Sequence, residues 1–67
     1  MPWSDKKYPV SMKNLTPEVR KKAVEIANAL LEEGMSEDRA IAIATAKAEA
    51  WAEHRDKPVK VTDEHKN

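Results

Sequence analysis

The chain has no cysteine and only one glycine among its 67 residues. Without cysteine it can form neither a disulfide bond nor a thiolate metal site, and it lacks a thiol nucleophile. The single glycine, Gly34, excludes the glycine-rich loops that cradle phosphates in nucleotide-binding proteins. Because disulfides are rare in reducing compartments, the absence of cysteine favours the cytoplasm, which is the location that we expect.

Long apolar runs are also missing from the chain. No stretch approaches the roughly 20 apolar residues of a membrane-spanning helix, and no apolar stretch follows the N-terminal lysines as it does in a secretory signal. We therefore expect no direct insertion into a membrane. A chain of this length forms a single domain, which buries about 60% of its unfolded surface and is marginally stable.

Basic and acidic side chains are equal in number, 12 of each, but they are separated along the chain. Residues 1–22 hold six bases and two acids, a net charge of +4. Residues 23–55 hold three bases and seven acids, a net charge of −4. Such a separation orients a partner or promotes self-association, and two ordinary solvated surfaces are the simpler interpretation.

The stretch NLTPEVRKK predicts the start of a helix. Thr16 suits the N-cap and Pro17 the first helical position. Apolar residues with the spacing of one helix face follow: Val19, Ala23, Ile26, Ala27 and Leu30. Gly34 is expected to end the helix in the left-handed conformation, so the first helix spans about residues 17–33.

A second helix follows almost at once, over about residues 37–55. Ser36 suits its N-cap, and the acids of its first turn match the positive end of the helix dipole. The segment is rich in alanine, which favours a helix over a strand. A link of about three residues forces an antiparallel or steeply crossing αα-hairpin. The stripe Ala40, Ala44 and Ala48 allows the helices to approach closely.

The N-terminal segment MPWSDKKYPVSMKNL has neither helical nor strand periodicity, yet it holds two of the three aromatic residues, Trp3 and Tyr8. We expect this arm to fold across the hairpin, with Trp51 beside both rings and a short helical turn after Pro9. Burial of such rings contributes several kcal/mol to a small domain. The alternative is an exposed aromatic arm that docks a partner.

The predicted fold class is therefore mostly α, an antiparallel αα-hairpin with an irregular N-terminal arm packed across it. Residues 1–55 form the single domain, and residues 56–67 form a flexible tail. Pro58 breaks any helical continuation. The stretch VKVT in the tail is expected to be coil or a short strand.

The polar residues form no catalytic or metal-binding pattern. His54 and His65 are the only imidazoles, and their spacing does not match a zinc site. The acids around Gly34 lack the spacing of a calcium loop, and no pair of them is placed like catalytic carboxylates. No serine or threonine lies in a nucleophile motif. We therefore expect a protein that is not an enzyme and that has no cofactor or metal.

Two helices joined by EEGMSED superficially resemble a helix-turn-helix motif. In that motif the N-terminal end of the second helix reads the DNA bases. Here that end carries Glu37 and Asp38, which phosphates repel. The lysine and arginine side chains near Trp3 and Tyr8 are better candidates for phosphate contact, so a nucleic-acid role stays open as an alternative.

Four segments together resemble small uncharacterised bacterial proteins of the YdaT type: MPW, YPVSMKNL, PEVRKKAVEIANALLEEG and RAIAIATAKAEAWAE. The resemblance covers about residues 1–55 and implies a bacterial cytoplasmic protein. In longer relatives of this type, a similar module precedes a second small domain. The resemblance implies no catalytic residues.

The chain is also similar to the ChaB family, which opens with Met-Pro-aromatic as this chain does. Pro9, Ser11 and Lys13 match its Pro-x-Ser-x-Lys step. Ala50 and Trp51 match an Ala-Trp pair in a late helix of that family. This similarity implies a regulator of cation transport.

The leading interpretation is a non-catalytic module that binds another protein or joins its own copies. The expected contact surface combines the aromatic arm with neighbouring bases: Trp3, Lys6, Lys7, Tyr8, Arg20 and Lys21. One alternative is a nucleic-acid accessory protein that uses the same basic arm. The other is a ChaB-like regulator of cation transport, which requires a membrane-protein partner.

Overall fold

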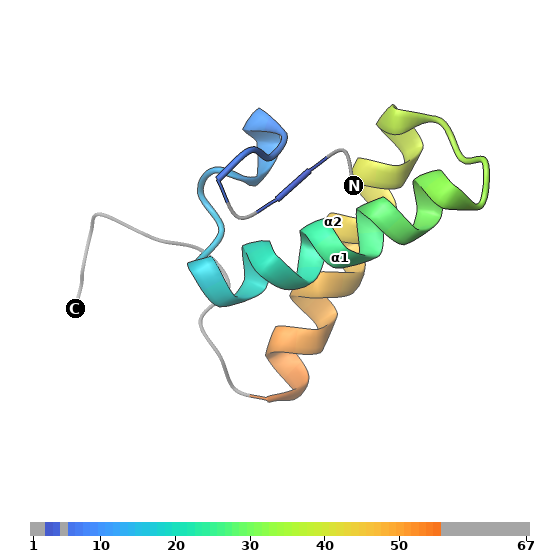
Figure 1. Ribbon diagram of the computed structural model, residues 1–67. Coiled ribbons are helices and arrows are strands. Elements are labelled where there is room, and N and C mark those ends of the chain that lie inside the picture. The colour runs from blue at the N-terminus through green and yellow to red at the C-terminus, as the bar shows by residue number, and fades with distance from the viewer. Residues whose placement is uncertain (1–2, 5, 56–67) are drawn as a thin grey trace.

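Two helices, α1 (Pro17–Glu32) and α2 (Glu37–His54), form an antiparallel hairpin, and the short 3-10 helix η1 (Val10–Met12) precedes them (Figure 1). They belong to a computed structural model that describes residues 3–4 and 6–55. The structure confirms the mostly α fold. Both long helices begin where the sequence predicts, and each ends one residue earlier than predicted.

The end of α1 depends on Gly34. Its φ of 99° lies in the left-handed region, where a residue with a Cβ is strained. The Met35 N–H donates to the Leu30 carbonyl at 3.1 Å, and the Gly34 N–H donates to the Leu31 carbonyl at 3.0 Å. These two hydrogen bonds form a Schellman C-cap, so the predicted helix stop is confirmed. Only residues 33–36 separate the two helices.

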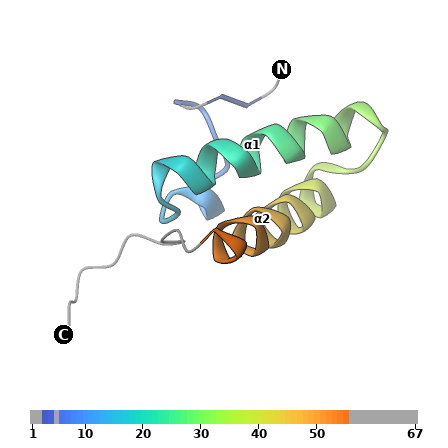
Figure 2. The ribbon, with the colours of Figure 1, turned by 90° about the horizontal axis from the view of Figure 1, so that it is seen from below.

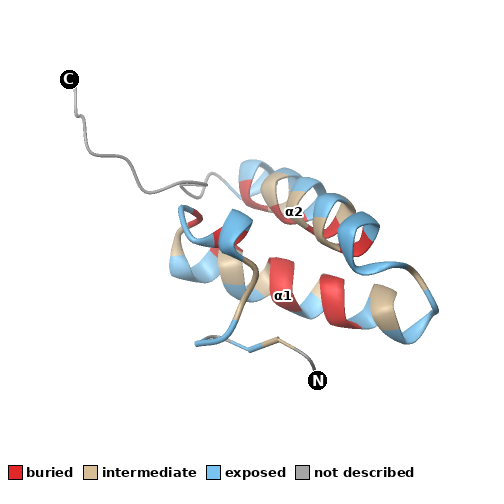
Figure 3. Cartoon of the chain, turned by 90° about the horizontal axis from the view of Figure 1, so that it is seen from above, coloured by how far each residue is buried: buried red, intermediate tan, exposed pale blue. Residues whose placement is uncertain are grey.

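A stripe of alanines on α2 makes its contact with α1. The four alanines of the stripe are completely buried: Ala40, Ala44, Ala48 and Ala52. Because the distance between packed helices depends on the side chains at the contact, alanine allows a close approach. Figure 3 shows the buried residues of α2 along the side that faces α1. Ala44 and Ala48 share one core cluster with residues of α1, so the predicted alanine contact is confirmed for these two, whereas Ala40 is buried outside that cluster.

The N-terminal arm crosses the hairpin and adds bulky side chains to its core (Figure 2). Met12 is completely buried and Leu15 is 2% exposed. Trp3 and Tyr8 pack against the same core and are partly buried. The predicted helical turn after Pro9 is confirmed as η1. The arm therefore fills volume that an alanine-rich hairpin leaves open.

Two further predictions concern membranes and the C-terminal tail. Within the part of the chain that the structure describes, no helix has the length and apolar character needed to cross a membrane. The flexible tail predicted over residues 56–67 lies outside the described residues. The VKVT stretch and His65 lie there too.

Candidate interaction surface

The side chain of Asn28 holds Trp3 against α1. The Trp3 N–H donates to Asn28 Oδ1 at 3.3 Å, and Asn28 Nδ2 donates to the Trp3 carbonyl at 3.0 Å. Asn28 is only 5% exposed. The oxygen and the nitrogen of its side-chain amide therefore both bond the main chain of Trp3, which lies 25 positions away in the sequence. The same exchange of one donated and one accepted hydrogen bond joins paired residues in an antiparallel sheet.

Asn28 was not among the predicted surface residues, although the sequence contains a signal for it. It lies on the apolar face of α1, one turn after Val24 and next to the completely buried Ala27. A buried amide needs hydrogen-bond partners, so an asparagine on such a face indicates a polar contact from another segment. The sequence does not say which segment, because the arm has no periodicity that would fix its path.

Asn28→Ala is expected to lower the free energy of unfolding by about 1–2 kcal/mol, because the Trp3 N–H and carbonyl lose both partners. The Trp3 amide should also exchange its hydrogen faster, while amides in the middle of α2 keep their protection. Denaturant titration and hydrogen exchange measure the two effects. Unchanged stability together with unchanged exchange at Trp3 would show that Asn28 does not hold the arm.

Arg20 holds the part of the arm from Tyr8 to Leu15 against α1. Its guanidinium carbon lies 4.5 Å from the centre of the Tyr8 ring. Its Nη1 donates to the carbonyls of Lys13 and Leu15, at 3.2 Å and 3.1 Å. A planar guanidinium suits this double role, since it stacks on a ring and donates in its own plane. Arg20 is thus engaged within the molecule.

Arg20→Ala is expected to lower the free energy of unfolding by about 1–2 kcal/mol, through loss of the stacked ring contact and of hydrogen bonds from a charged donor. Arg39→Ala is the matched control, because Arg39 is exposed on α2; it should change stability by less than about 0.5 kcal/mol. Thermal unfolding of both variants makes the comparison. Equal effects would rule out a special role for Arg20.

Trp51 does not lie beside the aromatic rings of the arm, and that expectation is corrected. Its ring centre is 5.5 Å from Lys22 Nζ and 5.0 Å from the guanidinium carbon of Arg55. Arg20, which contacts Tyr8, and Lys22 are two residues apart, so their side chains point in directions about 160° apart around α1. Tyr8 and Trp51 therefore lie on different sides of α1, and cationic side chains cover Trp51.

An open hollow lies where the arm meets α1. We call it the Trp3 hollow, and it is lined by Trp3, Ser4, Lys6, Lys21, Val24, Glu25 and Asn28. A second hollow is lined by Glu18, Lys21, Lys22, Glu25 and Trp51. Lys21 and Glu25, one helical turn apart, border both hollows and form the ridge between them.

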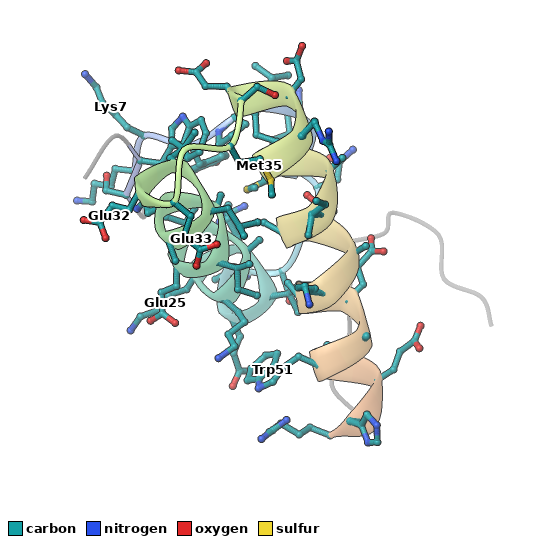
Figure 4. The ribbon with its side chains drawn as sticks, turned by 90° about the vertical axis from the view of Figure 1, so that its right-hand side faces the viewer. Lys7, Glu25, Glu32, Glu33, Met35 and Trp51 are labelled. Atoms are coloured by element: carbon teal, nitrogen blue, oxygen red, sulfur yellow. The ribbon has the colours of Figure 1, made fainter. Side chains whose placement is uncertain are left out.

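The structure divides the six residues of the predicted contact surface into three groups. Three of its residues line the Trp3 hollow: Trp3, Lys6 and Lys21. Lys7 is exposed and points away from the hairpin (Figure 4). Tyr8 and Arg20 pair with each other and hold the arm. The role of this surface in binding stays a prediction.

The chemistry available at the Trp3 hollow is that of binding through charge and apolar contact. It offers two ammonium groups, part of an indole ring and one carboxylate. Among the described residues, no three His, Asp or Glu side chains gather in a way that could hold a metal ion. Asn28 is the one buried polar side chain in that part of the chain, and it is bonded to the arm.

Comparison with known proteins shows similarity to a protein described as "Uncharacterized protein YdaT" from Bacillus subtilis (strain 168). The two are 63% identical over 54 residues, which make up 81% of this chain but only 36% of that relative's length. No family model and no solved structure matches the chain. The predicted resemblance to YdaT-type proteins is confirmed at the level of this similarity. The similarity to the ChaB family stays a prediction.

Proposed function

We propose that the chain is a non-catalytic module, of the YdaT type and cytoplasmic, that binds another protein through the Trp3 hollow. One observation carries the proposal: the folded arm presents a partly exposed tryptophan beside lysines from two different segments. Tryptophan is enriched among the residues that contribute most to protein binding. Lysines at the rim of such a site steer an oppositely charged partner and set its orientation.

Hydrogen bonds within the chain position the residues of the arm that line the Trp3 hollow. Asn28 fixes the main chain of Trp3. The Ser4 N–H donates to the Lys7 carbonyl at 2.7 Å, and the Lys7 N–H donates to Ser4 Oγ at 3.2 Å, so the turn that carries Lys6 is closed by two hydrogen bonds. A surface ordered in advance loses less conformational entropy on binding, which favours a binding role for the arm.

A nucleic-acid accessory role is the second candidate, and the exposed lysines of the arm favour it. Lysines beside an aromatic ring are the usual means of binding single strands. However, Arg20 and Lys22 lie over aromatic rings, so fewer basic side chains remain for contact with phosphates. A ChaB-like regulator of cation transport is the third candidate, and its partner would be a membrane protein.

Affinity capture from a lysate of the source cell, with and without nuclease, tests the proposed function. We expect a nuclease-resistant protein that binds the wild-type chain and is lost with the double variant Lys6→Glu/Lys21→Glu. The control Arg39→Glu/Lys47→Glu makes the same change of net charge at exposed positions on α2 and should retain the partner. Capture that vanishes with nuclease would favour the nucleic-acid role. Failure to capture any protein would contradict the proposal.

A further inference from the structure

We infer that the Trp3 hollow recognises an acidic segment of its protein partner, with carboxylates on both sides of one apolar side chain. This inference rests on the proposed function and adds the chemistry of the partner. The lysines of the hollow favour an acidic segment through charge complementarity. The apolar floor favours an apolar side chain within that segment, and the neighbouring acids favour a short segment.

The lysines of the Trp3 hollow are available for carboxylates. Lys6 belongs to the arm and Lys21 to α1, and both are exposed. Neither forms an ion pair within the part of the chain that the structure describes. Glu25 is the one acid among the described residues that line the hollow. Among the described residues that line the hollow, two lysines therefore stand against one acid.

Trp3 and Val24 give the hollow an apolar floor. The Trp3 ring is partly buried against the core, which leaves part of it accessible, and Val24 is 5% exposed. Covering apolar surface contributes about 25 cal/mol per Å², whereas an exposed ion pair contributes about 1 kcal/mol or less. The apolar contact thus supplies most of the affinity, and the lysines select acidic segments.

The acids next to the Trp3 hollow favour a short acidic segment over a nucleic-acid strand. Beyond Lys21 lies the second hollow, which is lined by Glu18 and Glu25 as well as by lysines. A regular run of phosphates that continues past Lys21 meets these carboxylates. An acidic peptide segment can end before them, so it avoids this repulsion.

The direct test is a titration of the full chain into a fluorescent peptide that carries glutamates on both sides of one leucine. A matched peptide with glutamine at each of those positions is the control. We expect the acidic peptide to bind more tightly, and its affinity to fall as salt screens the exposed charges. Lys6→Glu/Lys21→Glu should weaken binding about tenfold. Arg39→Glu/Lys47→Glu should weaken it by less than about threefold.

The inference is overturned if the glutamine peptide binds equally well, or if both double variants weaken binding to the same degree. Preferential binding of a single-stranded oligonucleotide at the same lysines overturns it as well. Self-association that Lys6→Glu/Lys21→Glu abolishes, without binding of the acidic peptide, overturns it too, because a second copy of the chain then occupies the hollow. Circular dichroism of each variant establishes that the helices are intact.

The inference and the proposed function fail in distinguishable ways. A captured protein that binds the lysine variant and the wild-type chain equally, at low and high salt, overturns acidic recognition but leaves a protein-binding module. Failure to capture any protein overturns the proposed function itself, whatever the peptide does.

Discussion

Met12→Ala is expected to lower the free energy of unfolding by about 2–5 kcal/mol. The Met12 side chain is completely buried and belongs to the core that η1 forms with both long helices. Alanine leaves a cavity there, because the surrounding helices can relax only in part. A domain of this length is stable by roughly 3–10 kcal/mol, so the variant loses a large share of its stability. Denaturant titration followed by circular dichroism measures the loss.

Val10→Ala is the matched control for Met12→Ala. Val10 lies in the same 3-10 helix but is 81% exposed, so its truncation should change stability by less than about 0.5 kcal/mol. A similarly small effect at Met12 would mean that the arm does not belong to the core.

Ala48→Leu is expected to lower the free energy of unfolding by about 3 kcal/mol, because a larger side chain forces the helices apart. Ala48 is completely buried in the middle of the alanine stripe. The shift of the unfolding midpoint in urea, at an unchanged slope, measures this effect.

Ala46→Leu on the same helix separates packing from helix propensity. Ala46 is exposed, and leucine is nearly as good a helix former as alanine. The Ala46→Leu variant should therefore unfold at nearly the same urea concentration as the wild-type chain, with a change in stability of less than about 0.5 kcal/mol. If the two leucine variants unfold alike, the alanine stripe is not the contact between the helices.

The two helices could be predicted because their signals are local. Thr16 and Ser36 occupy the predicted N-cap positions with extended backbone, and Gly34 takes the left-handed conformation that ends α1. Each signal depends on a few neighbouring residues and on backbone sterics alone. The alanine stripe was predictable for the same reason, since helical periodicity places its members on one face.

The surroundings of Trp51 could not be predicted, because they depend on how the two helices are rotated against each other. The sequence predicts that the two-helix hairpin leaves the Trp51 ring uncovered. Because the sequence does not fix the rotation of the helices, the sequence alone leads us to expect that the aromatic rings of the arm cover it. In the structure, Lys22 and Arg55 lie over the ring. The described residues contain three such cation–ring contacts, against roughly one per 70–80 residues in typical proteins. Cationic side chains thus replace a second apolar layer here.

The arm contributes both to the core and to the surface of the molecule. Its bulky side chains complete the core, whereas Trp3 and Lys6 contribute to the Trp3 hollow. Asn28 allows the arm to make both contributions, because it bonds the main chain of Trp3 and leaves the ring partly exposed. The position of Lys6 relative to Lys21 therefore depends on whether the arm is docked.

A double-mutant cycle between Asn28→Ala and Lys6→Glu tests most directly whether docking of the arm builds the binding surface. The affinity of the acidic fluorescent peptide is measured for the wild-type chain, both single variants and the double variant, all shown to be helical. We predict that Lys6→Glu weakens binding clearly when Asn28 is present and much less when it is replaced, with an interaction energy of about 0.5–1 kcal/mol. An equal effect of Lys6→Glu in both backgrounds would contradict a surface that the docked arm creates.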